Sequence, residues 1–128
     1  MKETLSKEMI RQLEKQLASE VGELLKCNES DNLRWKGTQS DLIEALYVAF
    51  TTFSLHDDEG QGLSFIHIVR SVCNIVHMPI PRNPYELASR SRRRKGVRRL
   101  TYMERYAYKM MMQPDERPLW RQIDNIQE

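Results

Sequence analysis

The chain has 128 residues, of which 40% are hydrophobic and 30% are charged, and its formal net charge is +2. This length and composition are typical of one folded domain with a polar surface, and they exclude a disordered, low-complexity chain. Two cysteines, Cys27 and Cys73, are too few for a disulfide-rich scaffold, and no apolar stretch approaches membrane-spanning length. Because the N-terminus also lacks an apolar signal segment, we expect a cytoplasmic protein with reduced thiols, Cys73 being a buried one.

Apolar side chains recur every three or four residues between positions 4 and 26. This spacing predicts an amphipathic helix, because such residues share one helix face. The stripe consists of Leu5, Met9, Leu13, Leu17, Val21 and Leu25, with Ile10 and Leu24 beside it. Two interpretations stay open: the helix packs on its own domain, or it forms a homodimer through residues 4–26. Glu20 interrupts the heptad pattern of a coiled coil.

The polar segment CNESDN, residues 27–32, is a predicted linker. In TQSD, Thr38 and Asp41 have the spacing of a capping box and predict the start of a helix over 38–54. Its apolar residues are Leu42, Ile43, Leu46, Tyr47, Phe50 and Phe53. Ser64 is the predicted cap of a second helix over 64–77, whose inward residues are Ile66, Val69, Val72, Cys73 and Val76. We expect Trp35 to be buried and to anchor the linker against helix 38–54.

A tight turn, MPIP, precedes a third helix. Asn83 is a good N-cap, Pro84 suits the first helical position and Glu86 stands three residues after the cap, so we expect a helix over 84–95 that Gly96 ends. TYME at 101–104 is another capping box and predicts a helix over 101–113. Its expected buried stripe is Met103, Tyr106, Ala107, Met110 and Met111, and a short docked C-terminal helix is expected around Pro118, Leu119, Trp120 and Ile123.

The helix over 84–95 lies in a strongly basic part of the chain. From Arg82 to Arg99 there are eight basic residues and one acid, a net charge of +7, whereas the rest of the chain carries −5. Successive residues of a helix are rotated by about 100°, which places Pro84, Leu87, Ala88 and Ser91 on one small, packable side. Glu86, Ser89, Arg90 and Arg93 point the opposite way, flanked by Tyr85, Arg92 and Arg94.

Two capped helices followed by a basic helix are the layout of a helix-turn-helix unit, whose last helix enters the major groove of DNA. Arginine suits this role because its guanidinium group can donate two parallel hydrogen bonds to guanine and can bind phosphates. We expect Arg90 and Arg93 to approach bases, and Lys95, Arg98 and Arg99 to hold phosphates. The full set of candidate DNA-binding residues is Arg82, Asn83, Tyr85, Ser89, Arg90, Arg92, Arg93, Arg94, Lys95, Arg98 and Arg99.

Other partners for the basic stretch stay open. It could be a solvated face without a ligand, a nuclear-localisation signal, or a surface that binds an acidic protein. RNA binding by stacking would need exposed aromatic side chains near the arginines, and Tyr85 and Tyr102 are the candidates.

The segment LRWKGTQSDLIEALYVAF resembles a motif of the RteC family, regulators found on bacterial conjugative transposons. The matching residues are Trp35, Gly37, Asp41, Leu42, Ile43, Glu44 and Tyr47, and similar residues downstream are Asn83, Tyr85, Arg92, Arg94, Lys95 and Arg98. The resemblance spans about residues 33–112, with Pro84, Glu86 and Ala88 departing from the family pattern. It implies a DNA-binding transcription regulator with a winged-helix C-terminal domain that acts in excision or transfer of a mobile element.

Nothing in the sequence points to catalysis, and we expect neither an enzyme nor a bound metal or cofactor. His56, His67 and His77 are too far apart for a local metal motif, and Asp57 and Asp58 lie in a polar loop. We therefore predict a mostly α, helix-turn-helix or winged-helix-like fold with at most a short two-stranded ribbon. The strand candidates are segments 33–35 and 97–100, which could pair with each other. The predicted organisation is an N-terminal helix and linker (1–32), a domain that binds double-stranded DNA (33–114) and a C-terminal tail or docked helix (115–128).

Overall fold

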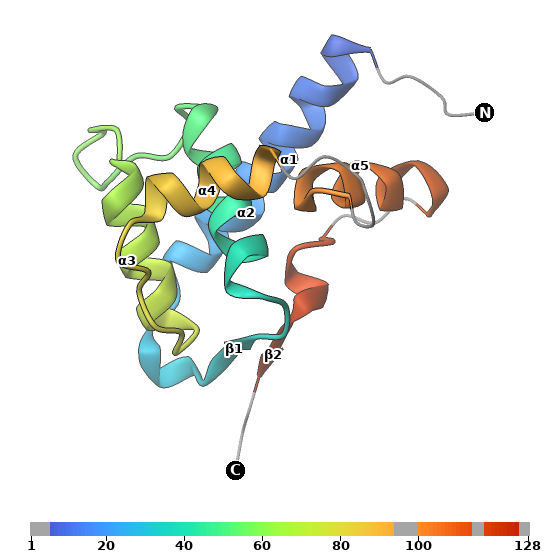
Figure 1. The fold of residues 1–128 in the computed structure, drawn as a ribbon. Coiled ribbons are helices and arrows are strands. Elements are labelled where there is room, and N and C mark those ends of the chain that lie inside the picture. Colours follow the sequence, from blue (N-terminus) through green and yellow to red (C-terminus); the bar gives the residue numbers. More distant parts are fainter. Residues whose placement is uncertain (1–5, 94–99, 114–116, 126–128) are drawn as a thin grey trace.

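Helix α2 (Gln39–Thr51) lies at the centre of the fold, with the other helices packed around it (Figure 1). The computed structural model describes residues 6–93, 100–113 and 117–125. The other helices are α1 (Lys7–Leu25), α3 (Phe65–Ile75), α4 (Pro84–Arg93) and α5 (Tyr102–Met112), with single 3₁₀ turns at η1 (Glu29–Asp31) and η2 (Trp120–Gln122). The mostly α architecture predicted from the sequence is confirmed. Among the described residues, no helix is long and apolar enough to cross a membrane.

The predicted helix caps form in the structure. Thr38 accepts a hydrogen bond from the backbone N–H of Asp41 at 3.1 Å, and Ser64 accepts one from His67 at 3.1 Å. Thr101 closes the capping box of α5, and Ser6 caps α1. Each capping oxygen satisfies a first-turn N–H that has no partner within its helix, which explains where the helices begin.

The sheet is a two-stranded antiparallel ribbon of β1 (Leu33–Trp35) and β2 (Ile123–Asn125). Trp35 pairs with Ile123, and Leu33 pairs with Asn125. The strand at 33–35 was predicted, and it pairs with the C-terminal segment. Residues 97–99 of the other strand candidate, 97–100, lie outside the described residues. The docked C-terminal segment is one 3₁₀ turn followed by this strand, with Leu119 fully buried.

The core is continuous from α1 to the C-terminal segment. The C-terminal half of α1 packs against α2 and α3, so this part of the helix packs on its own chain. The fully buried side chains of the core include Leu17, Val21, Leu24, Leu42, Ile43, Leu46, Phe65, Ile68, Val69, Val72 and Cys73. Phe50, an apolar residue of the predicted helix 38–54, and Leu87, on the packable side of the predicted helix 84–95, are partly buried.

Three residues that were expected within a helix or on its buried side lie elsewhere in the structure. Phe53 is 74% exposed, because α2 ends at Thr51 and Phe53 has a left-handed backbone (φ 55°) that takes it off the helical stripe. His77 lies beyond the end of α3, also left-handed, and its Nε2 is 3.0 Å from the Glu29 carbonyl oxygen. Met111 is 37% exposed, and the buried residues of α5 are Tyr102, Tyr106 and Ala107.

The connection between α3 and α4 is longer than the predicted tight turn. Residues 76–83 separate the two helices, whereas a helix-turn-helix motif has a turn of about three or four residues. The segment is held by bonds from Met78 N–H to the Cys73 carbonyl and from Gln39 Nε2 to the Pro79 carbonyl, both 2.8 Å. The helices α2, α3 and α4 therefore form a three-helix unit in which α2 packs against both others.

Trp35 is buried, with 4% of its surface exposed, as predicted. Its indole Nε1 donates a hydrogen bond to the carbonyl of Thr38 at 2.9 Å, which ties β1 to the start of α2. A Cβ at Gly37 would lie 2.9 Å from the same Nε1, closer than real contacts allow. The Trp-x-Gly spacing is thus explained by an indole that folds back over a residue without a side chain.

Candidate nucleic-acid interface

Helix α4 is held against α2 by its small residues. Pro84, Ala88 and Ser91 are buried, and Ser91 Oγ donates a hydrogen bond to the carbonyl of Ser40 at 3.4 Å. Asn83 Oδ1 accepts from the backbone N–H of Glu86 at 3.2 Å, so the predicted cap is present. The inner face predicted from the helical rotation is therefore the face that packs.

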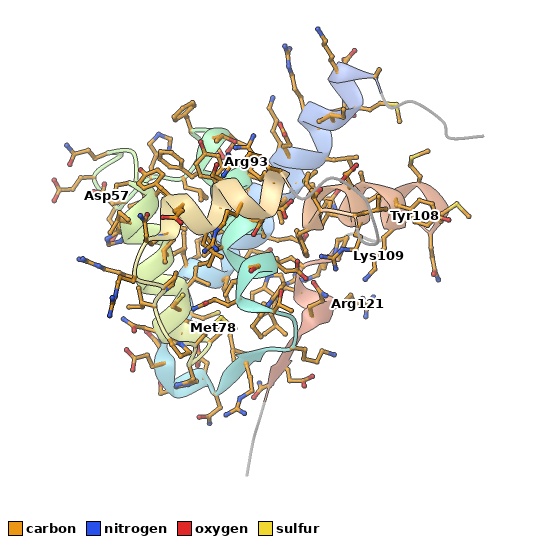
Figure 2. The ribbon with its side chains drawn as sticks, in the orientation of Figure 1. Asp57, Met78, Arg93, Tyr108, Lys109 and Arg121 are labelled. Atoms are coloured by element: carbon orange, nitrogen blue, oxygen red, sulfur yellow. The ribbon has the colours of Figure 1, made fainter. Side chains whose placement is uncertain are left out.

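The outer face of α4 is exposed and carries Ser89, Arg90 and Arg93. Arg90 Nε lies 3.9 Å from Glu86 Oε1, and because both side chains are more than half exposed this ion pair is weak. Arg93, labelled in Figure 2, donates from Nε to the carbonyl of Ser89 at 3.4 Å. A guanidinium has five N–H donors, so these single contacts leave both arginines able to bind a ligand.

One flank of α4 combines a cation with aromatic rings. Arg92 is exposed, and its guanidinium carbon lies 4.9 Å from the centre of the Tyr47 ring. Tyr85 packs against Phe65 with ring centres 4.8 Å apart, yet 49% of its surface is exposed. Arg82 is exposed just before the helix. Tyr102, the other aromatic candidate for stacking, is buried at 4% and is not available.

The structure brings together seven of the predicted site residues around α4: Arg82, Asn83, Tyr85, Ser89, Arg90, Arg92 and Arg93. Asn83 serves as the helix cap. The remaining four, Arg94, Lys95, Arg98 and Arg99, lie outside the described residues.

A buried carboxylate fixes the start of α5, the helix that follows the basic stretch. Glu44 of α2 accepts hydrogen bonds from the backbone N–H groups of Tyr102 and Met103, at 3.0 and 2.9 Å. An anion suits this place, because the first N–H groups of a helix lack internal partners and carry partial positive charge. Burial raises the pKa of Glu44, the two hydrogen bonds oppose the rise, and the nearby Asp41 adds to it.

Asp41 forms a second tie between α2 and α5. Its Oδ1 lies 2.6 Å from Nη2 of Arg105, and the Asp41 side chain is 6% exposed. The two carboxylates of the Asp-Leu-Ile-Glu segment therefore hold α5 by its first backbone N–H groups and by a side chain one turn later. The helices α4 and α5, which are neighbours in the sequence, are therefore both anchored on α2.

Glu20 of α1 holds the middle of α5 and the C-terminal segment. It is 3% exposed and accepts from the hydroxyl of Tyr106 at 2.8 Å and from the backbone N–H of Trp120 at 3.2 Å. Burial raises its pKa, and these hydrogen bonds oppose the rise. The sequence marked Glu20 only as a break in a heptad; an acid inside an otherwise apolar stripe is the signal that could have shown a buried acceptor.

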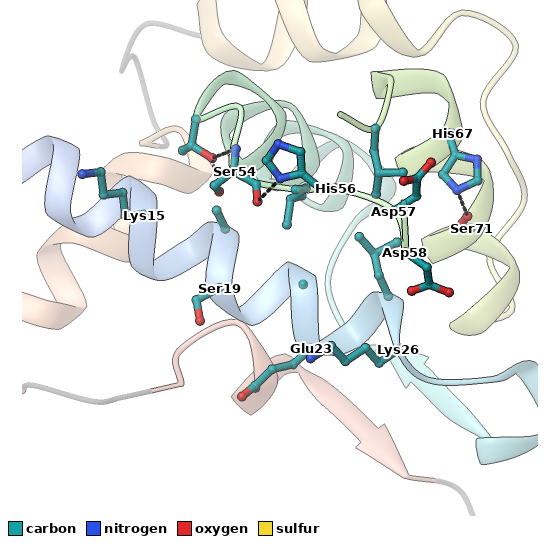
Figure 3. A pocket seen from close by; sticks show the side chains of 16 residues that line it. Lys15, Ser19, Glu23, Lys26, Ser54, His56, Asp57, Asp58, His67 and Ser71 are labelled. Atoms are coloured by element: carbon teal, nitrogen blue, oxygen red, sulfur yellow. Dashed lines mark hydrogen bonds between the residues drawn. The ribbon is translucent and has the colours of Figure 1, made fainter. Parts of the chain in front are cut away.

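His56, His67 and the paired acids Asp57 and Asp58 border an open groove of about 890 Å³ between α1 and the loop after α2 (Figure 3). Asp57 accepts from the N–H groups of Glu59 and Gln61, both at 2.9 Å, and so shapes its own loop. His56 Nδ1 is 3.0 Å from the Ser54 carbonyl, and His67 Nε2 is 3.4 Å from the Ser71 hydroxyl. Among the described residues, no three His, Cys, Asp or Glu side chains gather as a metal site.

Both cysteines are free thiols. Cys73 is fully buried in α3, and burial raises its pKa to about 11, so at neutral pH it is a protonated, unreactive packing residue.

No family model matches the chain, and no curated protein or solved structure matches it either.

Proposed function

We propose that this protein is a DNA-binding transcription regulator in which α4 contacts the major groove. The observation that carries the proposal is the division of α4 into a buried small-residue face and an exposed arginine face. A helix anchored in this way presents Arg90 and Arg93, three residues apart, on one side. Arginine forks at that spacing suit base edges and phosphates of duplex DNA.

The distribution of charge supports the same proposal. Segment 82–99 carries +7 in a chain whose remainder carries −5, so the attraction for a polyanion is concentrated at one place. The resemblance of residues 33–112 to RteC regulators points in the same direction and suggests control of excision or transfer genes of a mobile element. The protein then requires neither catalytic groups nor a cofactor.

An RNA with unpaired bases is the second candidate ligand. It is favoured by Tyr85, which is 49% exposed beside the arginines, since unpaired bases stack on aromatic rings. A protein with an acidic surface is the remaining alternative and is favoured by the same charge.

A competition experiment separates the three ligands. The full chain is bound to a fluorescent duplex, and unlabelled duplex DNA, structured RNA and an acidic protein compete at equal concentration of negative charge. We expect duplex DNA to compete best, and binding of about five phosphates would give a slope of log K against log[salt] near −4.5. Better competition by RNA or by the acidic protein would contradict the proposal.

A further inference from the structure

Helix α1 consists of two halves with different surroundings. In the C-terminal half, Leu17, Val21 and Leu24 are fully buried in the core. In the N-terminal half, Met9 is 46% exposed and Ile10 is 36% exposed, and Figure 1 shows these turns projecting beyond the body of the fold. The apolar stripe therefore continues past the surface that covers it.

The exposed part of α1 ends near the point where α5 contacts this helix. Gln16 Nε2 lies 3.9 Å from Met110 Sδ, Leu13 is already partly buried against the core, and residues 7–12 before it are exposed. Ile10, Leu13 and Leu17 follow one another at spacings of three and four, so the exposed residues lie on the same side as the buried ones. An apolar helix face that continues from the core onto the exposed surface is typical of an interaction surface.

The charges beside this stripe identify the partner. Lys7 and Glu14 are seven residues apart, or about two turns, so they lie on the same flank of the stripe, one on either side of Ile10. If two copies of α1 pack antiparallel about a two-fold axis near Ile10, Lys7 of each copy faces Glu14 of the other. Such a surface is complementary to itself, as an isologous dimer requires.

Other partners suit this surface less well. Residues 7–15 contain three bases and two acids, which interleave along the helix. An amphipathic helix that binds an anionic membrane or a nucleic acid needs a predominantly basic polar face. The balanced, alternating charges here favour a second copy of the same helix.

We propose that the protein forms a homodimer through the uncovered N-terminal turns of α1, paired antiparallel. Because the seam is short, we expect a weak dimer whose population depends on protein concentration. The interface lies on α1 and not on α4, so the proposal stands or falls independently of the DNA-binding proposal.

The first test is sedimentation equilibrium of the full chain, without DNA, over a wide range of concentration. The wild-type chain is expected to move from monomer to dimer, and Ile10→Glu to raise the dissociation constant by about tenfold or more. Gln12→Glu, on the opposite side of the helix, adds the same charge and should leave dimerisation unchanged. Circular dichroism verifies that both variants are folded, since neither position lies in the core. A wild-type chain that stays monomeric, or equal behaviour of the two variants, overturns the proposal.

A charge exchange tests the antiparallel pairing. Lys7→Glu and Glu14→Lys each place like charges opposite one another in a homodimer and should weaken it. When the two single variants are mixed, the heterodimer has both pairs restored, and the double variant should dimerise like the wild type. If α1 bound a different protein instead of a second copy, no such rescue would occur. Absence of rescue in the mixture therefore contradicts the pairing.

Discussion

Nη2 of Arg105 lies 2.6 Å from Oδ1 of Asp41, joining α5 to the central helix across 64 residues of sequence. Asp41 is almost fully buried, whereas the Arg105 side chain keeps 27% of its surface exposed. The pair is thus shielded from water on one side only. Loss of the acid leaves a guanidinium that can be only partly hydrated.

Asp41→Asn should lower the free energy of unfolding by about 2 kcal/mol, because it removes the charge from a largely buried pair. Urea unfolding measures the change. Asp124→Asn is the matched control: Asp124 pairs with Lys36 at 3.5 Å, but both side chains are half exposed, so its loss should cost less than about 0.5 kcal/mol. Equal effects of the two substitutions would show that the Asp41 pair is not shielded.

Gly37→Ala should destabilise the protein, because the new Cβ would lie 2.9 Å from the indole nitrogen of buried Trp35. The loss expected from overpacking is about 1–3 kcal/mol. Gly62→Ala is the control, since a Cβ there meets nothing within 4 Å. The thermal midpoint should fall for the first variant and hold for the second; a Gly37→Ala protein as stable as the wild type would mean that the indole can move away.

Trp35→Ala should cost on the order of 3 kcal/mol, as for other large-to-small core changes. The indole is 4% exposed, packs 6.1 Å from the ring of Tyr102 and bonds the Thr38 carbonyl, so its loss opens a cavity between β1, α2 and α5. Chemical denaturation gives the value. An unchanged midpoint would rule out a core role for this ring.

Stability should fall as the pH rises from about 4.5 toward neutrality. Burial raises the pKa of Glu44 above its unfolded value of 4.5, so between the two values the folded chain binds more protons than the unfolded chain. The stabilising contribution is complete below the unfolded pKa and is lost as the pH passes the folded pKa. Glu20 acts in the same direction, because burial raises its pKa as well.

The measurement for this prediction is the unfolding free energy from pH 4.5 upward, the unfolded pKa of Glu44 being the lower limit. Glu44→Gln cannot ionise, so its stability should fall less steeply with pH than that of the wild type. A slope remains, because Glu20 still titrates. Glu59→Gln, at an exposed loop position, should follow the wild-type curve. Parallel curves for all three proteins would contradict the assignment.

Local signals in the sequence predicted much of the fold. Thr38, Ser64, Asn83 and Thr101 act on N–H groups three residues away, and the inner face of α4 follows from rotation along one helix. Both kinds of feature are determined within a few residues, so a short pattern is enough to find them.

Features that depend on distant partners were not predicted. Glu44 bonds Tyr102 across 58 residues and Glu20 bonds Trp120 across 100, and no local pattern indicates which helix end a buried acid will meet. The pairing of β1 with the segment 123–125 was not predicted for the same reason, since the two strands are about 90 residues apart in the sequence. At the candidate site, the sequence located the arginine face of α4, but not the carboxylates that hold the neighbouring helix α5.

The most direct test of the proposed DNA-binding role is the affinity of Arg93→Ala for two duplexes, one selected from a random pool by the wild-type protein and one of random sequence. We predict a loss of about 1–3 kcal/mol on the selected duplex and little loss on the random one, because an arginine that contacts bases contributes to discrimination. Arg70→Ala removes an equal charge from an exposed position of α3 and should change neither affinity much. An equal loss on both duplexes, or no loss on either, would contradict the assignment of α4 as the helix that contacts bases.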